Sequence, residues 1–590
     1  MKDILNKRKV SKLTFQILFS FVIFMSYQSV NAQTTFPTNA KDSCASIKPS
    51  GFKDDLSKIT LPIPSYLGGP KTIGPFYDTE SGLVYVFPFN GPDFSSSTNP
   101  SSCNFFTWAA QTFLWATSTV SDGQSVPNPL TAPSNTTPYV FNSEFFYRYS
   151  DGTLTPQSAD GQANQSISAF SLRSLKSDDA TVGTDSVEQA GSKQGVLISQ
   201  GNNNNVSSDS SLVYYSVHTS RVMGYVAAAN MATSGAYTQF PTNKTEVCKA
   251  INYGLDNGYA KTTSISTLLM LTFCATESSS ALAAIKEKSP KKLPPVSIPD
   301  IEVAIDYLAL TVELKASWVK SDSLKDKSKY ILQKATIPTY TPSVKDAIGN
   351  KKSMTETGTE VAELAMVAMH VVGTVKGHPE MIWATIEHRD NAPQAEYSYE
   401  KTGGGTGTHS PSYSTDKAKS NWLFSDGSNS KQNKEFAATS CTAGTSICGY
   451  DSKKIDASNV LISNAWGVPS SSETAPSISS ELISLNNNIF GGLTSFNATN
   501  GIANDPRENY YLSGANWGKD GAIPTTSTAF KTTEGSTYLA NSTLETFEQN
   551  KGCFGCHYAS TDARNKAEAL TTSHIFGSIT SVVKAPKKSK

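Results

Sequence analysis

The chain has 590 residues, of which 38% are hydrophobic and 17% are charged, and its 50 basic and 50 acidic residues give a formal net charge of 0. This length and composition allow one large hydrophobic core or two to three domains. The balanced charge argues against a nucleic-acid-binding protein, and the short basic tail at 584–590 does not change that conclusion.

The N-terminal segment 1–32 is typical of a secretory signal peptide. Five basic residues precede an apolar run at 13–25, and small residues follow up to Ala32, where we expect cleavage. The run is short for a membrane span, so we expect no stable span after cleavage, with an uncleaved anchor as the alternative. Gln33 is not the cysteine of a lipoprotein anchor. Cleavage would leave 45 basic and 49 acidic residues in a periplasmic or secreted protein.

Six cysteines lie outside a C-terminal motif described below. An even number of cysteines in an exported chain favours three disulfides, although the sequence allows many connectivities. Pairing of neighbours closes the shortest loops, and it would join Cys44 with Cys103, Cys248 with Cys274, and Cys441 with Cys448.

The first clear helix is predicted at 105–117, where Asn104 can cap the helix and large apolar residues recur at helical spacing. Its aromatic side chains must be buried. Trp108, Phe113 and Trp115 suit ordinary core packing or the wall of a cofactor or substrate pocket.

Short strand-like runs follow in a polar part of the chain. Such runs lie at 139–148 and 195–198, and the apolar residues of 212–228 predict one or two buried strands, in which His218 is expected to be structural. We expect residues 33–285 to form the N-terminal part of a large body.

The second part of the body is expected at 300–520, after a basic and proline-rich connector at 286–299. Apolar and polar residues alternate along 308–318, which predicts a strand with one apolar face. Glu313 and Lys315 lie on the other face, where they are expected to line a polar region rather than an exposed edge.

A hairpin is predicted over 364–388, because two apolar runs at 364–373 and 381–388 are joined by a segment with glycine and proline. Several side chains with chemical potential are concentrated in this hairpin: His370, His378, Trp383, Glu387 and His388.

Symmetrical pairing about the turn would place His370 opposite Ala384. His370 and His388 would then share one face, whereas Trp383 and Glu387 would point to the other face. The two histidines would be about four residues apart along a strand, or roughly 13 Å, which argues against a shared metal ion.

The strongest motif is the sequence Cys-Phe-Gly-Cys-His near the end of the chain. The pattern Cys-x-x-Cys-His attaches a c-type haem, in which Cys553 and Cys556 would bond the vinyl groups and His557 would bind the iron. A helix is predicted at 544–550, capped by Ser542, just before the motif.

Two other interpretations of this motif lack their usual context. A zinc site would need a second Cys/His pair at ligand spacing, and a thioredoxin-like redox pair would open a βαβ unit. Only 33 residues follow His557. We therefore expect one covalently bound haem c.

The sixth position of the iron is open to several candidates. No methionine follows His557, which excludes a methionine ligand from that segment. His574 is the first choice because a short loop connects it to the motif. A histidine of the body (His370, His378 or His388) and an open or water-bound iron are the alternatives.

The second half of the chain resembles a known family. The blocks at 312–318, 369–373 and 378–393, together with 540–557, resemble large exported bacterial cytochrome c family proteins that carry one haem motif near the C-terminus. The resemblance implies no particular reaction. Di-haem peroxidases and di-haem oxygenases carry two such motifs, so an assignment as a peroxidase by analogy does not follow.

These observations predict an α+β fold, in which a sheet-rich body carries a haem-binding segment at 521–590 that packs against it. The expected function is a periplasmic haem-dependent oxidoreductase or electron-transfer protein, acting with a redox partner protein or a small-molecule substrate. His370, Trp383 and Glu387 are candidate substrate-site residues, and ordinary hairpin packing is the alternative role. A non-enzymatic partner- or glycan-binding protein with a relay or structural haem is the alternative function.

Overall fold

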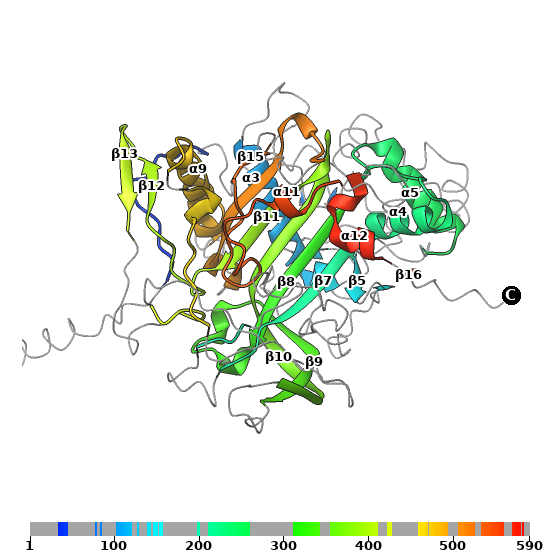
Figure 1. Cartoon of the computed structure of the whole chain (residues 1–590), viewed down its shortest axis with the longest axis horizontal. Coiled ribbons are helices and arrows are strands. Elements are labelled where there is room, and N and C mark those ends of the chain that lie inside the picture. The colour runs from blue at the N-terminus through cyan, green and yellow to red at the C-terminus, as the bar shows by residue number, and fades with distance from the viewer. Residues whose placement is uncertain are drawn as a thin grey trace, which may run out of the picture.

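The computed structural model has the expected α+β fold (Figure 1). The residues that it describes are 33–44, 77–78, 83–84, 102–117, 119–120, 127–128, 139–142, 146–150, 153–156, 197–200, 210–259, 311–342, 354–410, 422–427, 458–469, 471–493, 505–525, 533–559, 569–579 and 581–582. The predicted signal peptide, the connector at 286–299 and three cysteines, Cys274, Cys441 and Cys448, lie outside these residues.

One ten-stranded sheet forms the centre of the molecule, in the order β15-β14-β11-β10-β8-β7-β5-β6-β16, with β9 beside the outer part of β10 (Figure 1). All pairs are antiparallel except β6 with β16. The strands are β5 (Phe146–Ser150), β6 (Thr153–Pro156), β7 (Tyr214–Ser220), β8 (Val312–Lys320), β9 (Leu332–Pro342), β10 (Met354–Val375), β11 (His378–His388), β14 (Tyr510–Gly518), β15 (Thr533–Gly535) and β16 (Ser581–Val582). Both parts of the predicted body and the C-terminal segment therefore contribute to one sheet.

The remaining elements surround this sheet. The α-helices are α3 (Ser102–Ala116), α4 (Arg221–Ala232), α5 (Lys244–Asp256), α9 (Ala475–Asn488), α11 (Cys553–Cys556) and α12 (His574–Ser578). Two-stranded pairs are β1 (Tyr77–Asp78) with β2 (Leu83–Val84), β3 (Thr119–Val120) with β4 (Pro127–Asn128), and β12 (Tyr397–Glu400) with β13 (Thr406–His409). Short 3-10 helices lie at Val140–Asn142, Ser321–Ser323, Lys327–Lys329, Ala465–Gly467, Pro506–Asn509, Lys519–Gly521 and Ala569–Thr572.

Helix α3 covers one face of the sheet, and its existence confirms the prediction at 105–117. All its residues from Phe105 to Ala116 are buried. The ring of Trp108 lies against Gly373 of β10 so closely that a Cβ atom there would be 3.0 Å from the ring and 2.9 Å from the Thr311 carbonyl oxygen. Phe113 packs on Tyr510 of β14, with ring centroids 5.4 Å apart. The aromatic side chains of α3 therefore form core, the first of the two roles expected for them.

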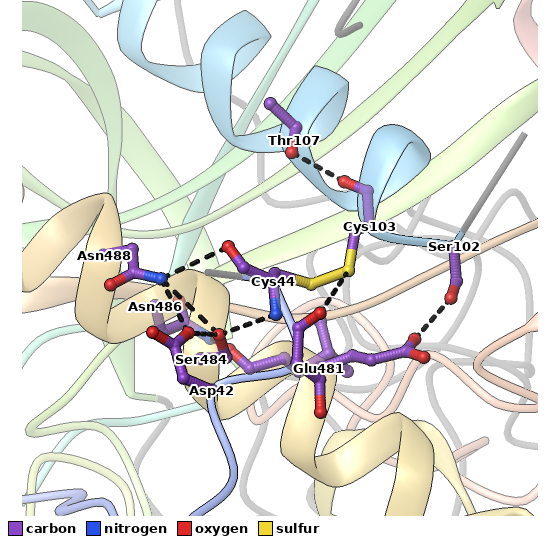
Figure 2. The surroundings of a disulfide bond; sticks show 11 residues. Asp42, Cys44, Ser102, Cys103, Thr107, Glu481, Ser484, Asn486 and Asn488 are labelled. Atoms are coloured by element: carbon purple, nitrogen blue, oxygen red, sulfur yellow. Dashed lines mark hydrogen bonds between the residues drawn. A yellow bond between two sulfur atoms is a disulfide. The ribbon is translucent and has the colours of Figure 1, made fainter. Parts of the chain in front are cut away.

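The disulfide between Cys44 and Cys103 ties the N-terminal segment to the start of α3 (Figure 2). This is the first predicted pair. The backbone N–H of Cys44 donates to Ser484 Oγ of α9 at 2.9 Å, and the hydroxyl of Ser102 donates to Glu481 of the same helix. Cys248 is also disulfide-bonded, to a partner outside the described residues. Two free cysteines are described, Cys553 and Cys556.

The hairpin at 364–388 forms, but the predicted register is wrong by one residue. His370 lies opposite Thr385, and Val371 lies opposite Ala384. A bulge near the turn, where Met381 has a φ of 70°, adds residues to β11 and shifts the pairing. A shift of one residue moves a side chain to the other face of a sheet. His370 therefore shares a face with Trp383 and Glu387, and His388 points to the opposite face.

Two further predictions need correction. The run at 212–228 is strand only to Ser220, because the Ser220 hydroxyl then accepts from the N–H of Met223 and caps α4. The segment at 544–550 forms turns instead of a helix. Asn541 Oδ1 accepts from the backbone N–H groups of Thr543 and Leu544, while the Ser542 hydroxyl donates to Glu387 of β11 and so does not cap a helix.

The C-terminal segment lies across the face of the sheet opposite to α3, so the predicted packing against the body is confirmed. Thr543 bonds to Ser317 of β8 at 2.7 Å, and its carbonyl oxygen accepts from Tyr215 of β7. Ser573 donates to Glu313 of β8 at 2.7 Å. The predicted polar lining on β8 is thus covered by this segment. Among the described residues, no helix is long and apolar enough to cross a membrane.

Candidate functional site

The pairing of the central strands aligns side chains in rows on the face that carries the C-terminal segment. One row contains Glu313, Val372, Trp383 and Asn516 of β8, β10, β11 and β14. The next row contains Lys315, His370, Thr385 and Gly514, and the third begins with Ser317, Ala368 and Glu387. Direct cross-strand neighbours point to the same face of a sheet. The rows therefore bring the candidates His370, Trp383 and Glu387 to one surface.

The motif turn, α11, lies on this surface. Cys553 and Cys556 are three residues apart on a single helical turn, which places their thiols on the same side. The N–H of His557 donates to the Cys553 carbonyl oxygen at 2.7 Å and ends the turn. Cys556 is exposed and Cys553 is partly buried.

The imidazole of His557 is held by three groups. Its Nδ1–H donates to the Thr572 carbonyl oxygen at 2.8 Å. The ring of Trp383 lies 4.1 Å away and that of His574 lies 4.0 Å away, centroid to centroid. Burial, and next the neighbouring His574, lower the pKa of His557 well below its usual value. A neutral imidazole with Nδ1–H fixed by a carbonyl oxygen presents Nε2 as its remaining electron pair.

Asn516 of β14 lies close to the Cys553 thiol. It is fully buried, and its interaction with Cys553 slightly opposes the rise that burial causes in the pKa of that thiol. Within the described part of the chain, neither the amide nitrogen nor the amide oxygen of Asn516 has a hydrogen-bond partner. A buried amide with so little hydrogen bonding is uncommon in folded proteins.

Trp383 is positioned by the bulge of β11. Its indole Nε1–H donates to the Glu380 carbonyl oxygen at 3.3 Å. The Glu380 carboxylate is buried and bonds to His378 Nδ1 at 2.8 Å and to the backbone N–H of Gly518 at 3.0 Å. Met381, which lies between Glu380 and Trp383, has a positive φ. Strained backbone of this kind is concentrated at functional sites.

His370 is held by the C-terminal segment itself. Its Nε2 lies 3.1 Å from the Glu545 carboxylate, eight residues before the first motif cysteine. Its Nδ1 is buried and has no hydrogen-bond partner among the described residues. His370 is therefore fixed at one nitrogen and open at the other.

Glu387 anchors the start of the segment that leads to the motif. The carboxylate is fully buried, and its Oε1 accepts from the Ser542 backbone N–H at 3.1 Å, from the Ser542 hydroxyl and from Asn391 Nδ2 at 3.1 Å. Burial raises the pKa of Glu387 to about 7, and the hydrogen bonds from Ser542 and Asn391 limit that rise. Glu387 is thus placed to fix the segment at Ser542, which lies eleven residues before Cys553.

The other histidines of the hairpin lie elsewhere. His388 stacks on Tyr330 with ring centroids 3.8 Å apart, and both of its ring nitrogens are bonded to backbone groups, of Lys329 and Asp390. His378 contacts Phe105 of α3 edge to face. The register thus separates these two side chains from the motif.

His574 lies beside His557 rather than across from it. The two rings are stacked, with an interplanar angle of 23°, and His574 Nε2 lies 3.1 Å from the Cys556 carbonyl oxygen. Two imidazoles that bind one metal from opposite sides have ring centres roughly 6 Å apart, since each metal–nitrogen bond is about 2 Å. Ligation of the same iron by His574 remains a prediction that requires this ring to move.

The residues around α11 fit a c-type haem. Neither thiol is in a disulfide, both lie on one turn, and the Nε2 atom of His557 makes no hydrogen bond within the described residues. Sequence reasoning found the motif residues and Trp383. It missed Asn516, Glu545 and Thr572, because only the strand register and the path of the C-terminal segment bring these residues to the motif.

Comparison with known proteins adds no relative. No protein-family model, no curated protein and no solved structure matches the chain.

Proposed function

We propose that the chain is an exported c-type haem protein, which works as a haem-dependent oxidoreductase or electron-transfer protein. The observation that carries the proposal is that Cys553 and Cys556, neither of them in a disulfide, lie on one helical turn and are followed by a His557 whose Nδ1 is already hydrogen-bonded. Carbonyl or carboxylate acceptors at the second ring nitrogen are typical of histidines that bind metals.

The roles of the residues follow from this arrangement. Cys553 and Cys556 would form the two thioether bonds, and His557 would bind the iron, which supplies reversible one-electron chemistry. The Thr572 carbonyl oxygen fixes the tautomer of His557, and Trp383 packs against its ring. The sheet beneath the motif excludes water from this side.

The large body supports a role beyond that of a small electron carrier. A simple carrier needs few residues, whereas here a ten-stranded sheet forms the floor of the site. The N-terminal signal pattern supports export, and export suits disulfides such as Cys44–Cys103. A partner protein or a small-molecule substrate would supply or accept the electrons.

The first test is covalent attachment. The full chain is expressed in a periplasm that contains the haem-attachment machinery, and denatured protein is analysed by mass and by its pyridine haemochrome spectrum. We expect one haem per chain with the spectrum of two thioether bonds. Substitution of both cysteines, Cys553→Ser with Cys556→Ser, abolishes attachment, whereas His409→Ala, at a distant histidine, does not. Absence of covalent haem from the wild-type chain would overturn the proposal.

A second test separates the two redox roles. Cyanide is added to the ferric protein and carbon monoxide to the ferrous protein. Rapid binding of either ligand supports an iron that activates a substrate, because activation needs an exchangeable position. Failure of both ligands to bind supports electron transfer and contradicts activation of oxygen or peroxide.

A further inference from the structure

The three body histidines that the sequence offers as partners of the haem iron are not equivalent in the folded chain. His388 is bonded at both nitrogens, and His378 contacts α3 on the far side of the sheet. His370 alone among these three points toward the face that carries α11.

The register places His370 close to the proximal site. His370 lies opposite Thr385, two residues from Trp383 on β11, so Trp383 is its diagonal neighbour. Side chains in this relation are roughly 7 to 8 Å apart at their base, within reach of long and aromatic groups. Since the Trp383 ring contacts His557, the two histidines lie near each other on this surface.

The hydrogen bonding of His370 has the form found in metal ligands. A histidine that binds a metal through one nitrogen usually gives the other N–H to a carboxylate or a carbonyl oxygen. The Glu545 carboxylate is hydrogen-bonded to Nε2 of His370, and Nδ1 is buried without a hydrogen-bond partner among the described residues. In His557 the roles of the two ring nitrogens are exchanged, since Nδ1 is hydrogen-bonded and Nε2 is not.

We infer that His370 supplies the sixth ligand of the iron through the nitrogen that Glu545 leaves open, an inference that rests on the proposed haem at His557. It replaces the first choice from sequence, His574, whose ring stacks beside His557. Glu545 is a positioning residue that orients the ring of His370. Two histidine ligands leave no open position, which favours electron transfer over substrate activation.

The test compares absorption and electron paramagnetic resonance spectra of ferric holoprotein. We expect low-spin iron in the wild type, high-spin iron in His370→Ala, and a return to low spin when free imidazole is added to that variant. The matched variants His574→Ala and His409→Ala stay low-spin. Covalent haem is measured in every sample, so failure of the proposed function (no haem) is distinguished from failure of this inference (haem present, wrong ligand).

A second variant addresses the role of Glu545. Glu545→Gln keeps the His370 ring but removes the negative charge, so it should stay low-spin and show a higher reduction potential than the wild type. Low-spin iron that persists in His370→Ala, or high-spin iron in the wild type, would overturn the inference. If His370→Ala does not fold, an unchanged potential in Glu545→Gln would count against it.

Discussion

The indole of Trp383 contacts the imidazole of His557 at 4.1 Å, and a strained bulge two residues away fixes the indole in that position. Trp383 is only 6% exposed, so the contact is made inside the protein. A strand residue thus supports a motif that follows it by more than one hundred residues of chain.

Removal of the Trp383 ring should loosen the proximal histidine. Trp383→Ala is expected to lower the free energy of unfolding by about 3 to 5 kcal/mol, as for other large aromatic residues in a core. In the proposed haem protein it should also broaden the electron paramagnetic resonance signal of the ferric iron, because the orientation of His557 is less restricted. Trp383→Phe keeps a ring at this position and should restore a narrow resonance. Equal spectra in the two variants would show that the contact does not orient His557.

The buried carboxyl of Glu387 is expected to make the folded chain more stable at low pH. Its pKa is raised from 4.5 to about 7, so between these values the folded chain holds a proton that the unfolded chain has lost. The stability that this proton provides is present at low pH and is lost as the pH rises toward 7. The contribution amounts to about 3 kcal/mol. Glu387→Gln should remove this slope, as measured by urea unfolding at a series of pH values, and an identical slope in both proteins would refute the assignment.

Loss of the disulfide should destabilise the chain measurably. Cys44 and Cys103 are 59 residues apart, and the loop-entropy model assigns about 4 kcal/mol to a loop of this length. The double variant Cys44→Ser with Cys103→Ser should therefore unfold at a lower urea concentration. Its covalent haem content should be unchanged, because the disulfide lies at α3, on the other face of the sheet. A fall in haem content without a fall in stability would contradict this separation.

The segment 521–590 should not fold by itself. Its backbone and side-chain polar groups are hydrogen-bonded to β7, β8, β10 and β11, and these partners would be missing. Expression of this segment with the haem-attachment machinery should give a protein without fixed tertiary structure, as judged by near-ultraviolet circular dichroism. A stably folded fragment with the absorption spectrum of the full chain would show that the sheet is not required.

Sequence reasoning located the elements better than their side-chain directions. Helix α3 and the hairpin of β10 and β11 were predictable, because aromatic residues at helical spacing and two apolar runs around Gly377 are local signals. The register was not predictable, since it depends on a bulge at Met381 that buries the Glu380 carboxylate against Gly518 of a distant strand.

The same limit applies to the site. The motif at 553–557 could be found in the sequence because the c-type haem that we propose requires a fixed spacing of its attachment residues. Asn516 and Glu545 carry no pattern of their own. Their relevance arises from the path of the C-terminal segment over the sheet, and the expected helix at 544–550 gave way to turns because Asn541 and Ser542 bond to backbone and to Glu387 instead.

The path of the C-terminal segment also bears on the order in which the chain folds. Ser573 bonds to Glu313 across 260 residues, and Thr543 bonds to Ser317 across 226. Contacts of such long separation form slowly, because they need strands that lie far earlier in the chain. The segment that carries α11 is thus expected to dock after β8 has formed. If the proposed haem is attached before docking, both thiols are accessible to the attachment machinery during that interval.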